Sequence, residues 1–224
     1  MKGKFGMLMV GLLMVVGCGR VIHISLVNIP HENGYRWEYK CYLLVGTTES
    51  SSFKRIRYID GTTTLTNGLT VQNFISTEEA AAQAAKIRSA VQIFGLPFSS
   101  PKSYCYIDGT GAYGYGSSTY PTIVPNLIIP LPLEVGRRWY RGTDMPMTYE
   151  AVSREDISVS AGTFKAIKIS LKYADGSDAK IYEWYADGVG LIKILIKDLE
   201  IVYPIDNPTL TNGDYIEELT SKNF

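Results

Sequence analysis

Few side chains in this sequence have the chemistry of catalysis, and their spacing fits no catalytic pattern. The two histidines, His23 and His31, both lie near the amino end, whereas a catalytic triad needs a histidine held between an acid and a nucleophile. The sequence contains no Gly-x-Ser-x-Gly elbow, His-Glu-x-x-His helix or Walker loop. We therefore predict no catalytic residue, no cofactor and no metal site.

Two pairs of adjacent carboxylates, Glu155-Asp156 and Glu217-Glu218, are the remaining candidates for acid–base chemistry. Adjacent side chains on a strand point to opposite faces, so we expect both pairs to be solvated loop charges. A glycosidase-type hydrolase that draws two acids from distant strands is the least favoured of our functional hypotheses.

The amino end has the pattern of an export signal. Lys2 and Lys4 precede an apolar run of 13 residues, Phe5 to Gly17. A transmembrane helix needs about 20 apolar residues, so this run is too short to remain as a membrane span. The pattern predicts a secretory signal.

The residues that follow, Val15-Val16-Gly17-Cys18, resemble the lipobox of bacterial lipoproteins. The resemblance implies that the Cys18 thiol receives a diacylglycerol, that the preceding bond is cut, and that the new amino terminus is acylated, palmitate being a typical chain. Two or more acyl chains anchor a protein stably to a membrane. The alternative is an ordinary signal peptide with a cysteine there by chance.

The lipobox also implies a domain organisation and a location. Residues 1–17 would be the signal peptide, 18–30 a lipidated tether and 31–224 a single β-rich domain. Gly19, in place of an aspartate, points to the outer membrane facing the periplasm if the source is Gram-negative. A Gram-positive source would place the protein on the outer face of its only membrane.

Two other cysteines, Cys41 and Cys105, would meet the oxidising envelope after export. We predict a disulfide between them, worth about 4 kcal/mol in the chain-entropy model. The alternative is two separate buried thiols that behave as small hydrophobic side chains.

Composition narrows the class of protein. The chain has 224 residues, 46% of them hydrophobic, with 22 basic and 22 acidic groups. Such a chain can bury enough surface to fold and carries no basic excess for nucleic acid. We expect one globular domain that does not bind nucleic acid.

Alternating patterns predict that most of this domain is strand. Tyr35 to Val45 is apolar at every second position, and residues 167–173, 181–186 and 191–203 form a similar series. Asp60-Gly61 and Asn67-Gly68 have the composition of hairpin turns.

One helix is expected at about 76–94. Ser76-Thr77-Glu78-Glu79 fits a capping box, and the apolar positions after it, Ala80, Ala84, Ile87, Val91 and Phe94, form one stripe. We expect residues 108–116, which are rich in Gly and Tyr, to form a flexible loop. The proline-interrupted run 121–132 should form an extended connector. The fold class is mainly β (β-rich α+β): a curved antiparallel sheet or open half-barrel with one packed helix.

Three segments carry a second family resemblance. They are Leu131-Pro132-Leu133-x-Val135-Gly136-x-x-Trp139, Val159-Ser160-Ala161-Gly162-Thr163-Phe164, and Trp184-Tyr185-Ala186-x-Gly188-Val189-Gly190-Leu191-Ile192-Lys193. Together with Gly34-Tyr35-Arg36-Trp37 they resemble a broad group of uncharacterised bacterial lipoproteins and periplasmic proteins. The resemblance covers roughly residues 30–45 and 125–200, implies a curved antiparallel sheet, and supplies no active site.

The leading functional hypothesis is a membrane-anchored envelope lipoprotein without catalytic activity, which shelters a hydrophobic small molecule or lipid in its curved sheet. The sequence has 16 Tyr and three Trp, and such rings can line a cleft while their polar tips bond elsewhere. Trp37, Trp139 and Trp184 are the candidate lining residues. The alternative is an envelope scaffold that binds another protein through the Gly/Tyr loop or an exposed sheet edge.

Overall fold

The computed structural model describes residues 28–80, 84, 87, 100–141, 147–173, 176–203 and 209–224. These residues contain twelve strands in a single sheet, with the order β6-β5-β4-β3-β2-β1-β12-β11-β10-β9-β8-β7. The strands are β1 (Arg36–Val45), β2 (Thr48–Thr64), β3 (Thr70–Glu79), β4 (Lys102–Asp108), β5 (Gly111–Ser117), β6 (Pro121–Pro130), β7 (Arg138–Arg141), β8 (Met147–Val159), β9 (Gly162–Lys172), β10 (Asp178–Ala186), β11 (Gly190–Tyr203) and β12 (Thr209–Lys222).

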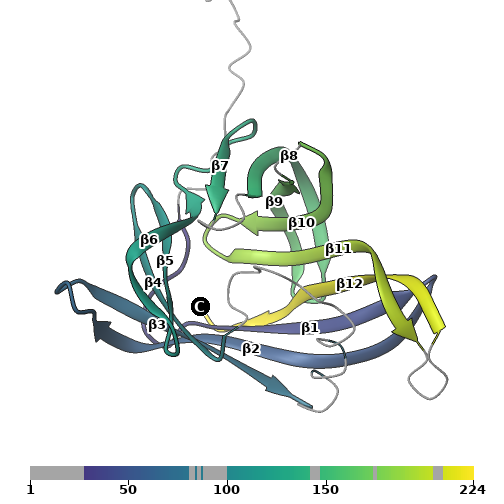
Figure 1. The fold of residues 1–224 in the computed structure, drawn as a ribbon, viewed down its shortest axis with the longest axis horizontal. Coiled ribbons are helices and arrows are strands. Elements are labelled where there is room, and N and C mark those ends of the chain that lie inside the picture. The colour runs from purple at the N-terminus through teal and green to yellow at the C-terminus, as the bar shows by residue number, and fades with distance from the viewer. Residues whose placement is uncertain are drawn as a thin grey trace, which may run out of the picture.

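Every pair of neighbouring strands is antiparallel, and the sheet curves until its two edges approach each other (Figure 1). Side chains of β7 bridge the edges: Trp139 Nε1 and Arg141 Nε both donate to the backbone oxygen of Ile128 in β6, at 2.9 and 2.6 Å. The predicted curved antiparallel sheet is therefore confirmed, and it is almost closed. Among the described residues, no helix is long and apolar enough to cross a membrane.

The core lies on the concave face of this sheet. In β1 the inward positions Trp37, Tyr39, Cys41 and Leu43 are each at most 5% exposed, and the positions between them are more exposed. This is the alternation that the sequence predicted, and it arises because successive side chains of a strand point to opposite faces. Corresponding positions on the other strands complete one continuous apolar cluster inside the curved sheet.

The helix prediction was wrong at its start. Ser76 to Glu79 belong to β3, where Lys54 of β2 lies opposite Glu79 and Arg55 lies opposite Glu78. Arg55 forms an ion pair with Glu78 at 3.0 Å, so this carboxylate pairs across strands and does not cap a helix. Helical geometry is seen at Ala84 and Ile87, which are buried in the core as the predicted stripe requires. The remainder of the predicted stripe, except Ala80, lies outside the described residues.

Two glycine-containing segments predicted as a turn and a loop are parts of strands. The chain does not reverse at Asp60-Gly61, since β2 continues through these residues. A bulge shifts the pairing of β2 with β3 there, and Gly61 takes a positive φ of 67°. A bulge with one residue in this left-handed region favours glycine. The expected Gly/Tyr loop is mainly β5, where a Cβ on Gly111 would lie only 2.7 Å from the backbone oxygen of Ile129. Glycine therefore allows β5 to approach β6 closely.

The proline-rich run 121–132 is mostly strand β6 and not a free connector. It lies at an edge of the sheet, where proline is tolerated because no further strand needs its missing N–H. The Asn67-Gly68 turn is confirmed between β2 and β3, with Gly68 at a φ of 84°.

Candidate functional site

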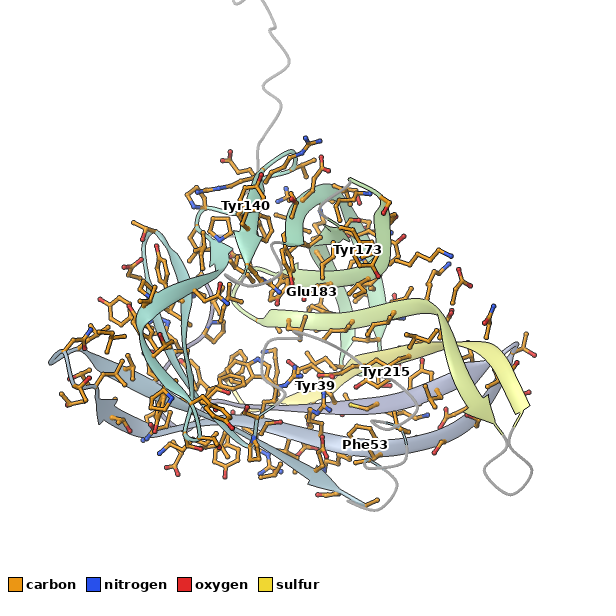
Figure 2. All side chains as sticks on the ribbon, viewed as in Figure 1. Tyr39, Phe53, Tyr140, Tyr173, Glu183 and Tyr215 are labelled. Atoms are coloured by element: carbon orange, nitrogen blue, oxygen red, sulfur yellow. The ribbon has the colours of Figure 1, made fainter. Side chains whose placement is uncertain are left out.

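A small cavity lies inside the curved sheet. Its volume is about 60 Å³, and its walls come from β1 to β6, β10, β11 and the chain just before β1. Figure 2 shows Tyr39, one of the lining residues, within the ring of strands. The lining residues are Ile29, Pro30, Trp37, Tyr39, Arg57, Ile59, Phe74, Cys105, Ile107, Ala112, Ile128, Ile129, Tyr185, Gly190 and Leu191.

The polar atoms of the aromatic lining are bonded to the protein. Trp37 Nε1 donates to the backbone oxygen of Val189 at 2.8 Å, and the Tyr39 hydroxyl donates to that of Leu191 at 3.0 Å. The Tyr185 hydroxyl donates to a buried carboxylate. Buried polar groups that are bonded in this way have little to offer a ligand. These rings thus give the cavity an apolar wall.

Arg57 is the charged residue in the lining, and its charge is neutralised behind the wall. Its Nη1 lies 2.7 Å from Oε1 of Glu217, and its guanidinium stacks over the Tyr39 ring at 4.8 Å. Glu217 is fully buried and also pairs with Arg55. Burial raises the pKa of a carboxyl, but the charges of Arg57 and Arg55 outweigh it and hold the pKa of Glu217 below its usual value. Glu217 is therefore an anion locked into an ion cluster.

A second buried ion pair joins β7 to β10. Arg141 and Glu183 form a two-pronged pair, with Nη1–Oε1 and Nη2–Oε2 distances of 3.0 Å. The Tyr185 hydroxyl donates to Glu183 at 3.0 Å, and the Arg141 guanidinium lies 3.9 Å above the Tyr149 ring. Both oxygens of Glu183 are therefore bonded to partners within the protein, and the pair serves to hold β7 against β10.

Residues Asn28–His31, here called the strap, contribute Ile29 and Pro30 to the cavity wall. The Gly188 amide donates to the Asn28 oxygen at 3.0 Å, and the Asn28 amide donates to Asp187 Oδ1 at 3.0 Å. At the carboxyl end of the strap, Gln72 Nε2 donates to the His31 backbone oxygen at 3.4 Å. The strap thus links the β10–β11 turn to β3. Strand β3 is not a neighbour of β10 or β11 in the sheet.

The three predicted tryptophans have different places. Trp37 is one of the residues that line the cavity. Trp139 lies at the junction of the sheet edges, where it stacks on Tyr149 at a centroid distance of 5.7 Å. Trp184 donates its Nε1 hydrogen to Glu155 and lies beside Tyr182. Neither of the last two is among the residues that line the cavity.

The disulfide predicted between Cys41 and Cys105 is absent, since both are free, buried thiols. Cys41 is in β1 and Cys105 is in β4, three strands away. At a strand spacing of about 4.8 Å this separation exceeds the roughly 7 Å limit between the Cα atoms of a disulfide. Burial raises the pKa of Cys105 to about 12, so the thiol that lines the cavity is protonated and weakly nucleophilic. Cys18 lies outside the described residues.

The charged inner residues were missed by the sequence analysis. Glu217, expected as a solvated loop charge, is fully buried on β12. The missed signal is that Arg55 and Arg57 share the alternating inner positions of β2 with Phe53 and Ile59, all at most 8% exposed. Arginines in phase with apolar residues indicate buried cations, which need buried anions. Within the described part of the chain, no group of His, Cys, Asp and Glu could hold a metal ion.

Comparisons with known proteins give only distant likenesses. No protein-family model matches the sequence, and no curated protein matches it. The chain is similar to a Bacteroides fragilis protein described as exported, with a YmcC-like fold, at 14% identity and a TM-score of 0.46, covering 89% of this chain and 100% of that one.

Two further solved structures are similar over most of their length. One is described as a lipoprotein of Parabacteroides distasonis, at 16% identity and a TM-score of 0.41, covering 89% of this chain and 99% of that one. The other is a LolA superfamily protein of Nitrosomonas europaea, at 9% identity and a TM-score of 0.23, covering 88% of each chain. Likenesses at this level assign no family or function.

Proposed function

We propose that this protein is a lipid-anchored envelope protein without catalytic activity, which shelters the apolar end of a lipid or similar ligand inside its curved sheet. The observation that carries the proposal is the cavity, whose lining is apolar except for Arg57. Apolar pockets exclude water and bind apolar groups, because such a site offers water no partners.

The size of the cavity limits what it can receive. Its 60 Å³ is several times the 10–15 Å³ that one water needs but smaller than the roughly 150 Å³ cavity known to bind benzene. It fits a narrow group such as the end of an acyl chain. A bulkier ligand needs the walls to move apart.

Anchoring supplies the second half of the proposal. Cys18 is proposed as the lipidated residue, following removal of residues 1–17, and residues 18–30 as the tether to the domain 31–224. The outer membrane, facing the periplasm, is the proposed site in a Gram-negative cell. Replacing Cys18 with serine should release the protein from the membrane fraction and abolish palmitate labelling. A serine variant that stays with the membranes, with no labelling of the original chain, would contradict the anchor.

Ligand binding is tested by filling the cavity. Ala112→Leu adds bulk at a lining position, and Ala161→Leu makes the same change outside the cavity, after β8. We expect the unchanged protein and Ala161→Leu to bind a fluorescent acyl-chain probe such as parinaric acid, whose chain is narrow, and Ala112→Leu to bind it at least about tenfold more weakly. Native mass spectrometry of the purified chain should also show a co-purified apolar molecule.

A second variant keeps the test decisive if Ala112→Leu fails to fold. Ile128→Ala enlarges the cavity from another wall and should tighten binding of probes with one or two more carbons. An unchanged protein that binds no apolar probe and carries no apolar molecule would overturn the proposal.

A further inference from the structure

The β5–β6 hairpin has an unusual composition. Residues 109–133 contain no Asp, Glu, Lys or Arg. One part of the hairpin faces the core, where Ala112 and Ile129 are buried. Its free end carries three exposed apolar or aromatic side chains: Tyr120 is 80% exposed, Ile123 55% and Val124 62%. These three residues are here called the hairpin tip.

The backbone around the hairpin tip is held in place. The Ser117 amide donates to the Tyr120 oxygen at 3.1 Å, and the Tyr120 amide donates to Ser117 Oγ at 3.2 Å. Gly116 has a φ of 77°, and a Cβ there would lie 2.2 Å from the Tyr120 oxygen, so this turn requires glycine. The Val124 amide donates to Thr122 Oγ1 at 3.1 Å. These contacts hold the backbone of a segment whose apolar side chains are exposed.

The shape and size of this surface argue against a protein partner. A stable protein interface involves about 20–30 residues and roughly 800 Å² on each side, far more than three side chains supply. Pairing with a strand of another chain is also opposed, because Pro121, Pro125 and Pro130 lie on this edge strand and lack donors.

The same features suit the boundary between lipid headgroups and acyl chains. A few apolar side chains bind there without a large matching surface, and tyrosine favours this region because its ring is apolar and its hydroxyl is polar. The backbone of Lys102 lies beside the turn that leads to the tip, since the Ser118 amide donates to its oxygen at 3.0 Å. Its Nζ lies over the Tyr104 ring, 5.6 Å from the centroid, and adds one positive charge next to the hairpin, which favours anionic lipids.

We propose that the hairpin tip inserts shallowly into the surface of a phospholipid bilayer that contains anionic lipids. This contact is separate from the lipid on Cys18 and from the cavity, and it orients the domain on the membrane. The proposal goes beyond ligand sheltering, and neither depends on the other.

Tryptophan placed in the tip would report the insertion. The native Trp37, Trp139 and Trp184 are at most 5% exposed, so they are shielded from lipid. We would compare Val124→Trp with Tyr173→Trp, which places the same ring at an exposed site away from the tip; Tyr173 is 51% exposed. The full chain is mixed with a large excess of phosphatidylethanolamine–phosphatidylglycerol vesicles whose acyl chains carry bromine, which quenches indole only at short range.

We expect brominated vesicles to remove most of the emission added in Val124→Trp and little of that added in Tyr173→Trp. Equal quenching in both would mean insertion without preference for the tip and would overturn the proposal. No quenching of Val124→Trp in lipid excess would also overturn it. Ile123→Trp is a second reporter at the same surface, should the first variant not fold. A cavity that binds no probe would leave these results unaffected.

Discussion

Replacing Glu217 with glutamine should strongly destabilise the fold. The variant keeps the size of the side chain but removes the carboxylate that neutralises Arg55 and Arg57, both at most 8% exposed. Removing one partner from a buried ion cluster costs about 3–5 kcal/mol, because the remaining charge stays away from water. Domains of this size are stable by only about 5–15 kcal/mol, so the loss would be a large share of the total.

Urea unfolding followed by the emission of the buried tryptophans measures this loss. Glu218→Gln is the matched control, since the neighbouring side chain pairs with Lys193 at 3.6 Å near the surface and is 18% exposed. The control should lose at most about 1 kcal/mol. A loss below about 1 kcal/mol for Glu217→Gln, or equal losses in the two variants, would refute the buried-cluster reasoning.

The same comparison has a pH dependence with a definite sign. The cations at Arg57 and Arg55 lower the pKa of Glu217 in the folded state against the opposing effect of burial. The stabilisation by its ionised form is complete above the ordinary pKa near 4.5 and is lost as the pH falls below that value. The gap in unfolding free energy between the unchanged protein and Glu217→Gln should therefore narrow in acid. A gap that stays constant or widens would show that the charge is not responsible.

Three further changes test other parts of the structure. Hydrogen bonds, the strongest from Lys54, lower the pKa of Glu38 to about 2. Glu38→Gln should therefore be less stable than the unchanged protein at pH 7, by about 1 kcal/mol or less. Urea titrations should show that this difference disappears as the pH falls from 4.5 to 2. Trp139→Phe removes the 2.9 Å bond to Ile128 and should cost about 1 kcal/mol and speed hydrogen exchange in β6; unchanged exchange would mean that this bond does not hold the edges. Asp187→Ala removes the acceptor of the strap's amide and should speed apolar-probe uptake in stopped-flow measurements; an unchanged rate would show that the strap does not limit access.

The strands with clear alternation could be predicted because one face of each is buried. The series from Tyr35 to Val45 predicted β1 correctly, since its apolar residues fall at every second position. β5 was missed because glycine is a poor indicator of strand, although here it allows close approach of Ile129. β12 was missed because its buried face includes Glu217, and a charge interrupts the apolar period.

The helix and the disulfide show where local patterns are insufficient. The Ser76–Glu79 segment matches a capping box, but the partners of its carboxylates lie on β2, far away in the sequence. Likewise, two cysteines in an exported chain suggest a bridge, and only the strand order shows that Cys41 and Cys105 are three strands apart. Both errors arise from contacts between distant segments, which override local preference.

Arg57 belongs both to the buried ion cluster and to the cavity wall. A change in the cluster should therefore affect the stability of the fold and also which ligands the cavity binds. The Arg57 guanidinium contributes to the cavity wall, while Glu217 neutralises it from the side of the core. In Glu217→Gln that neutralising charge is gone, and the wall of the cavity becomes cationic. Uncharged apolar probes should then bind more weakly and anionic amphiphiles more tightly, because an anion near Arg57 would replace the lost carboxylate. If both probes kept their affinities in a folded Glu217→Gln variant, Arg57 could not be in the wall that the ligand contacts.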